Sequence, residues 1–366
     1  MKTILFNLTD SELESFVLNM GLPRFRAKQI REWLNRGAPD FSVMKNLPVE
    51  LREKLSEKAE TLPLKVVKKL ESTDNQTTKF LLELNDCEQI ECVLMRTTYG
   101  NSVCVSSQAG CAMGCKFCAS TLLGLKRNLT INEMFAQVLI AQWELRGDRF
   151  TTKDIRPNGD PNNNDVSHIV VMGTGEPLQN TENVIGFLER ANSELNISWR
   201  RITVSTCGIV PGIDALNTWG RPINLAISLH APYDELRTQI MPINNRYKIN
   251  EVLDAAFKFS DTHNRQLMIE YILLGKRNKN GEIELLNSNP ECAEKLSTLM
   301  HGHNVMVNLI PWNAVDERDF ASISGNAVHR FQDILIKNGV HTRIRRERGA
   351  DIGSACGQLR LNNAKK

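Results

Sequence analysis

Four cysteines fall within fifteen residues of one short segment, from Cys104 to Cys118. Cys111, Cys115 and Cys118 are spaced C-x3-C-x2-C, and Cys104 precedes Cys111 by seven residues. Zinc takes four ligands, whereas three thiolates can hold three irons of a [4Fe–4S] cluster and leave the fourth iron open. No histidine lies between Cys104 and Ser167. The spacing therefore favours an iron–sulfur cluster, with zinc and a distant fourth ligand as the alternative.

Two other segments have the composition of reactive sites. Cys356 lies in "GADIGSACGQL", where small neighbours indicate an accessible thiol. Glu176 lies in "GTGEP", in which Gly173 and Gly175 allow a ligand to approach the backbone closely.

The bulk composition sets limits on the class of protein. The chain has 366 residues, of which 41 % are hydrophobic, and Lys plus Arg exceeds Asp plus Glu by only three. This weak positive charge does not itself indicate a nucleic-acid partner, which must be sought in local clusters. No apolar run reaches the roughly 18–20 residues that span a bilayer, and the N-terminus does not resemble a signal peptide. We expect a cytoplasmic protein in which clustered cysteines serve metal or redox chemistry rather than structural disulfides.

The patterning predicts where these residues lie. Residues 1–62 read as helices, with a capping box at Thr9 and Glu12, and short strands joined by hairpins follow. Strands alternating with helices are then expected, which indicates a curved parallel sheet with its site at the strand ends. The strands are predicted at 168–173, 201–206, 224–230, 267–274, 305–311 and from 341, and a surface loop at 156–165.

The cysteine triplet, with Phe117 before its last cysteine, resembles the radical S-adenosylmethionine (SAM) enzymes. The resemblance implies that SAM binds the open iron and is cleaved to a 5′-deoxyadenosyl radical, chemistry that no side chain supplies. It also implies that Glu176 and nearby backbone hold the amino group of SAM.

The chain as a whole resembles the bacterial dual-specificity RNA (adenine-C2) methyltransferases. The resemblance is carried in order by "CVSSQ", the cysteine triplet, "GEP", "STCG", "SLH", "MPIN", "LIPWN" and "ACGQL". It implies methylation of adenosine C2 in the peptidyl-transferase centre of 23S rRNA and in tRNA, 3′ of the anticodon. The implied fold is α/β, a partial (β/α) radical SAM barrel with an N-terminal helical accessory domain. The expected divisions are an RNA-binding domain at 1–62, a β-hairpin extension at 63–100, the barrel at 101–350 and a C-terminal segment at 351–366.

The same resemblance implies a role for each matched residue. Cys356 carries a methyl group from one SAM, a second SAM provides the radical, and the resulting carbon joins protein to RNA. Cys104 then attacks the sulfur of Cys356, forming a disulfide and releasing the methylated base, while Glu91 accepts a proton. The residues expected to contact SAM are Gly175, Glu176, Ser205, Ser228, Leu229, His230 and Asn313.

The expected partners are 23S rRNA, tRNA and an external electron donor such as flavodoxin or ferredoxin, with no membrane and a monomeric protein. RNA contacts are sought in basic clusters, above all Lys126 and Arg127 beside the cysteine triplet. The others are Arg24, Arg26, Lys28, Arg31, Arg36, Arg200, Arg201, Arg343, Arg345, Arg346 and Arg348. The remaining cysteines, Cys87, Cys92, Cys207 and Cys292, match no catalytic position and are interpreted as packing or neutral residues.

Two alternatives stay open at this stage. An adenine-C8 methyltransferase of the same superfamily would use the same five cysteines. A metal-stabilised RNA-binding module without catalysis would leave Cys104, Cys356 and "GTGEP" without a role. Thr174, Gly353 and Ser354 also depart from the residues usual in the family, which leaves the rate and the mobility of the C-terminal segment open.

Overall fold

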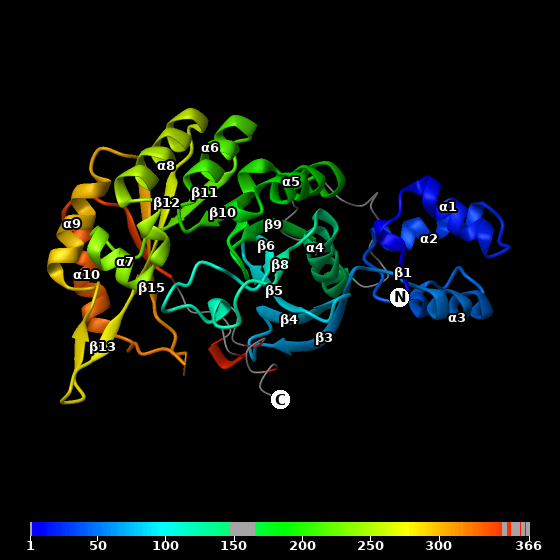
Figure 1. The fold of residues 1–366 in the computed structure, drawn as a ribbon, viewed down its shortest axis with the longest axis horizontal. Coiled ribbons are helices and arrows are strands. Elements are labelled where there is room, and N and C mark those ends of the chain that lie inside the picture. Colours follow the sequence, from blue (N-terminus) through cyan, green and yellow to red (C-terminus); the bar gives the residue numbers. More distant parts are fainter. Residues whose placement is uncertain are drawn as a thin grey trace.

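The computed structural model describes residues 2–146, 165–315, 317–345, 350–352, 359 and 363. The predicted loop at 156–165 lies outside them except for Asp165. The chain begins with a small helical unit at one end of the molecule (Figure 1). Its helices are α1 (Asp10–Asn19), α2 (Phe25–Asn35) and α3 (Val49–Lys58), and short strands β1 (Thr3–Ile4) and β2 (Ala59–Glu60) pair at its base. The predicted capping box of Thr9 and Glu12 is present.

An antiparallel meander follows, as the alternating apolar pattern predicts. Its strands are β3 (Leu64–Glu71), β4 (Thr77–Leu84), β5 (Gln89–Thr97) and β6 (Gly100–Cys104). The turns between them contain Asn75 and Cys87, both with positive φ. β6 then pairs in parallel with β9 (Val166–Val171), so the meander and the strands that follow form one continuous sheet.

The second half of the sheet is parallel and alternates with helices. In the described chain the sheet has ten strands, in the order β16-β15-β12-β11-β10-β9-β6-β5-β4-β3. The parallel strands lie close to their predicted positions: β10 (Ile202–Thr206), β11 (Asn224–Ser228), β12 (Leu267–Leu273), β15 (Val305–Pro311) and β16 (Thr342–Ile344). The helices between strands cover the outer face of the curved sheet (Figure 1). They are α4 (Ile131–Arg146), α5 (Thr181–Leu195), α6 (Val210–Trp219), α7 (Asp234–Ile240), α8 (Ile249–His263), α9 (Pro290–Met300) and α10 (Gly325–Lys337).

The helical unit packs on α4 through aromatic contacts. The rings of Phe6 and Phe135 stack 6.2 Å apart, and the Arg190 guanidinium lies 4.2 Å from the Phe135 ring centroid. Gly37 of the helical unit lies so close to the Leu139 carbonyl that a Cβ would stand 2.6 Å from that oxygen. This contact requires glycine at position 37.

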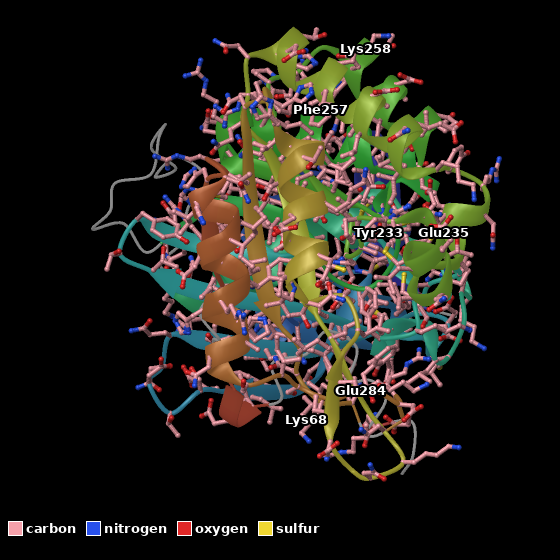
Figure 2. The ribbon with its side chains drawn as sticks, turned by 90° about the vertical axis from the view of Figure 1, so that its left-hand side faces the viewer. Lys68, Tyr233, Glu235, Phe257, Lys258 and Glu284 are labelled. Atoms are coloured by element: carbon pink, nitrogen blue, oxygen red, sulfur yellow. The ribbon has the colours of Figure 1, made fainter. Side chains whose placement is uncertain are left out.

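A hairpin of β13 (Gly275–Arg277) and β14 (Ile283–Leu285) protrudes at one end of the molecule, where Figure 2 labels Glu284. At the opposite end the same view labels Phe257, whose ring stacks on that of His303 with centroids 3.5 Å apart. None of the helices in the described residues is both long and apolar enough to cross a membrane.

Candidate active site

One cavity of about 920 Å³ is lined by residues of the meander, of the parallel strands and of the loops at the carboxyl ends of those strands. Cys111, Cys115 and Cys118 line it together with Cys104. Ligand sites commonly have volumes of about 300–1,000 Å³, so this one has room for a nucleoside-sized cofactor beside a second group. The cavity therefore brings the predicted cluster ligands and the predicted resolving thiol into one space.

The cysteine triplet lies on a loop closed at its base by β7 (Gln108–Ala109) and β8 (Arg127–Asn128). Three contacts from distant segments hold the loop in place. The Lys116 amide donates to the Ile240 carbonyl, the Trp312 indole donates to the Phe117 carbonyl, and Arg318 donates to the Cys118 carbonyl. The backbone of the cysteine loop is thus held by hydrogen bonds to distant segments, and its thiols line the cavity.

The three thiols fit a [4Fe–4S] cluster. Cys111 and Cys115 are only 7 % and 8 % exposed. Burial raises the pKa of the Cys111 thiol to about 12 and also raises the pKa of Cys115, whereas a bound metal deprotonates a ligating thiol outright. In the described chain no three His, Cys, Asp or Glu side chains converge as they would around a single metal ion. A cluster does not need such convergence, because each thiolate binds a different iron.

Glu176 connects the loop after β9 to the loop after β10 by hydrogen bonds. Its carboxylate accepts hydrogen bonds from the Leu178 amide at 2.9 Å and from the Cys207 amide at 2.8 Å. Its own amide donates to Gln108, beside the cysteine loop, and burial raises the pKa of its carboxyl. Glu176 lines the cavity, so it can face the amino group of SAM while fixing the turn around it.

The glycines of "GTGEP" line the cavity and also have a packing role that the sequence did not indicate. A Cβ at Gly173 would lie 2.8 Å from the Ser106 amide nitrogen, and one at Gly175 would lie 2.9 Å from that of Gln108. Gly175 also has φ +112. These glycines are therefore required by close packing on the segment before the cysteine loop. Thr174 between them is buried and does not line the cavity.

Most of the other residues expected to contact SAM also line the cavity. These are Gly175, Ser205, Ser228, His230 and Asn313. Leu229 differs, because its fully buried side chain is not among the lining residues. Its amide donates to the Glu270 carbonyl and its carbonyl accepts from Arg237, so both of its backbone groups are already used within the protein.

His230 is held in a left-handed conformation with φ +60, at the end of β11. Its Nδ1 accepts a hydrogen bond from the Ile272 amide at 3.0 Å, which places the ring proton on Nε2. Burial and then the Arg237 charge lower its pKa to about 3, so the ring is neutral at physiological pH. The Phe117 ring packs edge-on against it at 4.9 Å and joins the cysteine loop to this strand end.

Sequence reasoning missed Arg237, which is fully buried behind the strand ends. Its guanidinium donates to the carbonyls of Cys207, Ser228 and Leu229 and to the Asn244 side chain. It therefore connects the "STCG", "SLH" and "MPIN" segments. An arginine within a polar helix such as α7 gives no local sequence signal that it points inward.

On the meander side, Cys104 ends β6 and is 8 % exposed. Glu91 on β5 is 4 % exposed and forms an ion pair of 2.9 Å with Lys79 on β4. Lys79 lines the cavity, whereas Glu91 is not among the lining residues.

Cys356 lies outside the described residues, as do Gly353 and Ser354. The described residues on either side of it make contacts with the meander. The Thr73 amide donates to Asp351, and Asn363 donates to Gln89 at the start of β5. Ile352 lines the cavity. Asp351 and Asn363 are thus attached to the meander, which carries Glu91.

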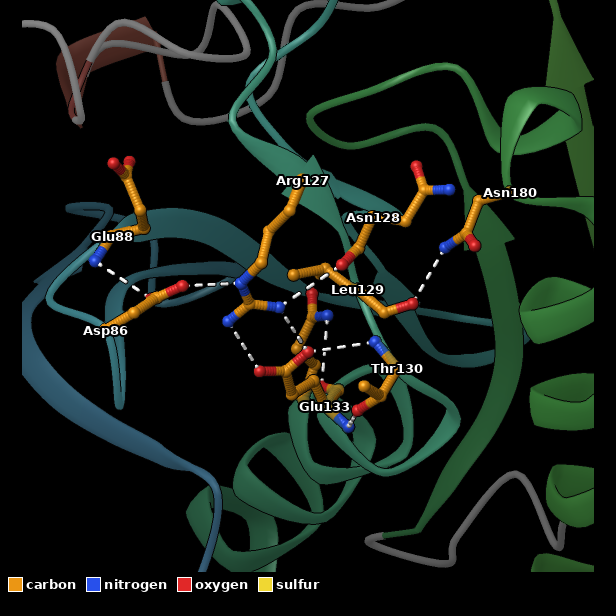
Figure 3. A network of polar contacts seen from close by, with 9 residues as sticks. Asp86, Glu88, Arg127, Asn128, Leu129, Thr130, Glu133 and Asn180 are labelled. Carbon is orange, nitrogen blue, oxygen red and sulfur yellow. Dashed lines mark hydrogen bonds and ion pairs between the residues drawn. The ribbon is translucent and has the colours of Figure 1, made fainter. Parts of the chain in front are cut away.

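Arg127, expected to contact RNA, is engaged within the protein (Figure 3). Its guanidinium pairs with Asp86 at 2.5 Å and with Glu133 at 2.8 Å. These carboxylates raise its pKa further. Glu133 also forms a capping box with Thr130 at the start of α4. Arg127 therefore fixes the base of the cysteine loop to the meander, a structural role that the sequence did not indicate.

The remaining cysteines differ in their surroundings. Cys92 and Cys292 are buried in packing positions, as expected, and Cys87 is exposed in a turn. Cys207 is more than a packing residue, because it lines the cavity and its amide holds Glu176.

Comparison with known proteins agrees with this geometry. Residues 105–287 match the model of the radical SAM superfamily, and residues 3–61 match that of the ribosomal RNA large subunit methyltransferase N-terminal domain. A crystal structure of a radical SAM methyltransferase from Sphaerobacter thermophilus superposes with a TM-score of 0.80 at 38 % identity, covering 97 % of this chain and 98 % of that one. The fold and site therefore define a radical SAM methyltransferase, whose class uses a [4Fe–4S] cluster and SAM.

Two curated relatives narrow this class. The probable dual-specificity RNA methyltransferase RlmN of Lachnoclostridium phytofermentans is 44 % identical, covering 98 % of this chain and 94 % of the relative. That of Clostridium acetobutylicum is 44 % identical, covering 99 % and 98 %. The chain belongs to the RlmN family of dual-specificity RNA methyltransferases.

Proposed function

We propose that the protein methylates carbon C2 of adenosine in 23S rRNA and in tRNA, with Cys356 as methyl carrier and Cys104 as resolving thiol. The observation that carries the proposal is the single cavity lined by Cys104 and by all three cysteines of the triplet. The full-length similarity to dual-specificity RNA methyltransferases supports the substrate class. The proposal includes a cytoplasmic location, a flavodoxin or ferredoxin as electron donor and a monomeric enzyme.

In this proposal Cys111, Cys115 and Cys118 hold the cluster. Glu176, Ser205, Ser228, His230 and Asn313 surround SAM on the parallel strands. When bound, the cluster and SAM supply the one-electron chemistry that activates the methyl group on Cys356.

Three groups of the chain complete the transfer. Adenine C2 is not a nucleophile, so the activated carbon on Cys356 would add to the ring. The C2 hydrogen would then leave as a proton to Glu91, and the remaining unpaired electron would be taken up by the cluster that the cysteine triplet would hold. The Cys104 thiolate then attacks the Cys356 sulfur. A sulfur–sulfur bond forms, the sulfur–carbon bond breaks, and the released carbon takes up a proton to become the methyl group. Such exchange requires that the two thiols meet, which agrees with the attachment of residues 351 and 363 to the meander.

Nucleoside mass spectrometry tests the proposal. Anaerobically reconstituted enzyme is incubated with SAM, a reductant and either 23S rRNA or tRNA from cells that lack the gene. The expected product in both RNAs is 2-methyladenosine, identified against authentic 2-methyl and 8-methyl standards. Formation of 8-methyladenosine would assign the alternative activity, and cleavage of SAM without any RNA product would refute both.

A further inference from the structure

A buried ion pair between Lys79 and Glu91 lies against the cavity, on the meander side. The two side chains are 2 % and 4 % exposed, and the Lys79 Nζ lies 2.9 Å from a Glu91 oxygen. Lys79 lies opposite Val93, and Val93 lies opposite Cys104, so one row across β4, β5 and β6 joins the lysine to the resolving thiol. Lys79 and Cys104 both line the cavity.

Stability does not explain this pair. Removing two charges from water costs several kcal/mol per ion, and an apolar pair of similar volume often gives equal or greater stability. The surrounding residues of β4, Phe80, Leu81 and Leu82, are buried and apolar. A charged side chain that lines a cavity is a candidate for a functional role.

A second feature of β4 indicates that the part of the cavity lined by this strand binds a polar group. Thr77, two residues from Lys79, also lines the cavity and is 4 % exposed. Its Oγ1 has no hydrogen-bond partner among the described residues. Buried hydroxyls normally have a partner, so the Thr77 hydroxyl is available to a ligand that enters beside Lys79.

We propose that Lys79 is a positioning residue for Glu91, holding its carboxylate in place when the target adenine occupies the cavity. This inference rests on the proposed function. In that function the C2 proton of the adenine goes to a Glu91 oxygen, and Lys79, which lines the cavity, lies 2.9 Å from that carboxylate. Without the Lys79 ammonium, the Glu91 carboxylate loses this ion pair and with it the position from which it accepts the proton.

The experiment compares Lys79→Met, Lys79→Arg, Glu91→Gln and the double variant Lys79→Met/Glu91→Gln with the unmodified enzyme. Lys68→Met, on the exposed strand β3, is the matched control. Iron content and methylation of Cys356, read by peptide mass spectrometry, show that each variant folds and reaches the step before proton transfer. The double variant removes both charges, so it leaves no lone buried charge to disturb folding.

Single-turnover methyl transfer to RNA is then measured at pH 7. We expect Lys79→Met to lose about 10²–10⁴-fold, the usual contribution of a general base. Lys79→Arg should keep most of the rate. The double variant should be no slower than Glu91→Gln, because Lys79 acts through Glu91.

Three results would overturn the inference. Full activity of Lys79→Met, an equal loss in Lys79→Arg, or an additional loss in the double variant would each show that Lys79 does not position Glu91. Absence of 2-methyladenosine with the unmodified enzyme would instead refute the proposed function, and the inference with it. Measuring 2-methyladenosine with the unmodified enzyme therefore distinguishes failure of the inference from failure of the proposed function.

Discussion

The two halves of the sheet place their site residues in different ways. In the parallel half, Glu176, His230 and Asn313 lie just beyond strand ends. In the antiparallel meander, Lys79 and Glu91 lie within strands and reach the site only through the strand register. The difference shows that one cavity is built from turns on one side and from a pleated surface on the other.

The halves also differ in chemistry. The parallel half and the cysteine loop carry thiols and polar groups suited to a cluster and SAM, whereas the meander carries an ion pair and the thiol of Cys104. If each half serves one stage of the reaction, substitutions in the first should stop SAM cleavage. Substitutions in the second should preserve SAM cleavage and stop the later steps.

The largest effect is expected at the cysteine triplet. Cys115→Ala should lose the brown [4Fe–4S] chromophore and reduce SAM cleavage and RNA methylation to background, because three irons need three thiolates. Absorbance, iron analysis and 5′-deoxyadenosine release measure this. Cys292→Ala, a buried thiol outside the cavity, is the control and should keep its iron. A full cluster in Cys115→Ala would show that this residue is not a ligand.

Cys104→Ala should separate the two stages. The variant should keep its cluster, cleave SAM and carry a methyl group on Cys356, yet fail to release RNA. Protein joined to RNA through Cys356 should accumulate, survive denaturation and disappear after nuclease treatment. Gel mobility and peptide mass spectrometry detect it. Loss of iron would instead make Cys104 a cluster ligand, and normal turnover would exclude the disulfide step.

His230 allows a finer test of the parallel half. His230→Ala loses the acceptor for the buried Ile272 amide, which costs about 1–3 kcal/mol, and left-handed backbone is unfavourable for alanine. Asparagine tolerates that conformation and offers an acceptor oxygen. Thermal melting and SAM binding should therefore rank the variants with His230→Asn above His230→Ala. Equal melting temperatures and equal SAM binding of the two variants would show that neither the left-handed backbone at position 230 nor the acceptor for the Ile272 amide is important.

The same residue predicts a pH dependence of stability. Its pKa is lowered in the folded protein to about 3, so between pH 6.5 and 3 the unfolded chain binds a proton that the native site excludes. Its contribution to stability is thus complete above pH 6.5 and decreases as the pH falls through this window. Chemical unfolding at pH 7 and pH 5 should show a smaller loss of stability in His230→Asn than in the unmodified protein. An identical loss in both would contradict the lowered pKa.

The smallest effect is expected at Arg127, which joins the halves without lining the cavity. Its side chain is 32 % exposed, so Arg127→Gln should cost only about 1 kcal/mol, equivalent to about 2 °C in melting temperature. SAM cleavage should be nearly unchanged. A large loss of RNA binding, measured by filter binding, would show that Arg127 contacts RNA, as the sequence suggested.

The sequence predicted the positions of the parallel strands along the chain because buried strands give continuous apolar runs and turns give short polar segments. It also located Glu176 and His230, since both follow such runs directly. It could not show that Lys79 faces Glu91, because their pairing depends on the register of two strands. Nor could it show that Arg127 lies between Asp86 and Glu133, since Asp86 is 41 residues away along the chain.

The outer edge of the meander has a consequence for behaviour at high concentration. β3 is the last strand of the sheet, and an open edge invites strand addition from another molecule. This edge carries exposed Lys65, Lys68 and Lys69, and its register shifts between Val66 and Lys68. Like charges repel a second copy of the same edge, and an irregular register presents a poor template. β3 therefore protects the exposed side of the sheet against aggregation.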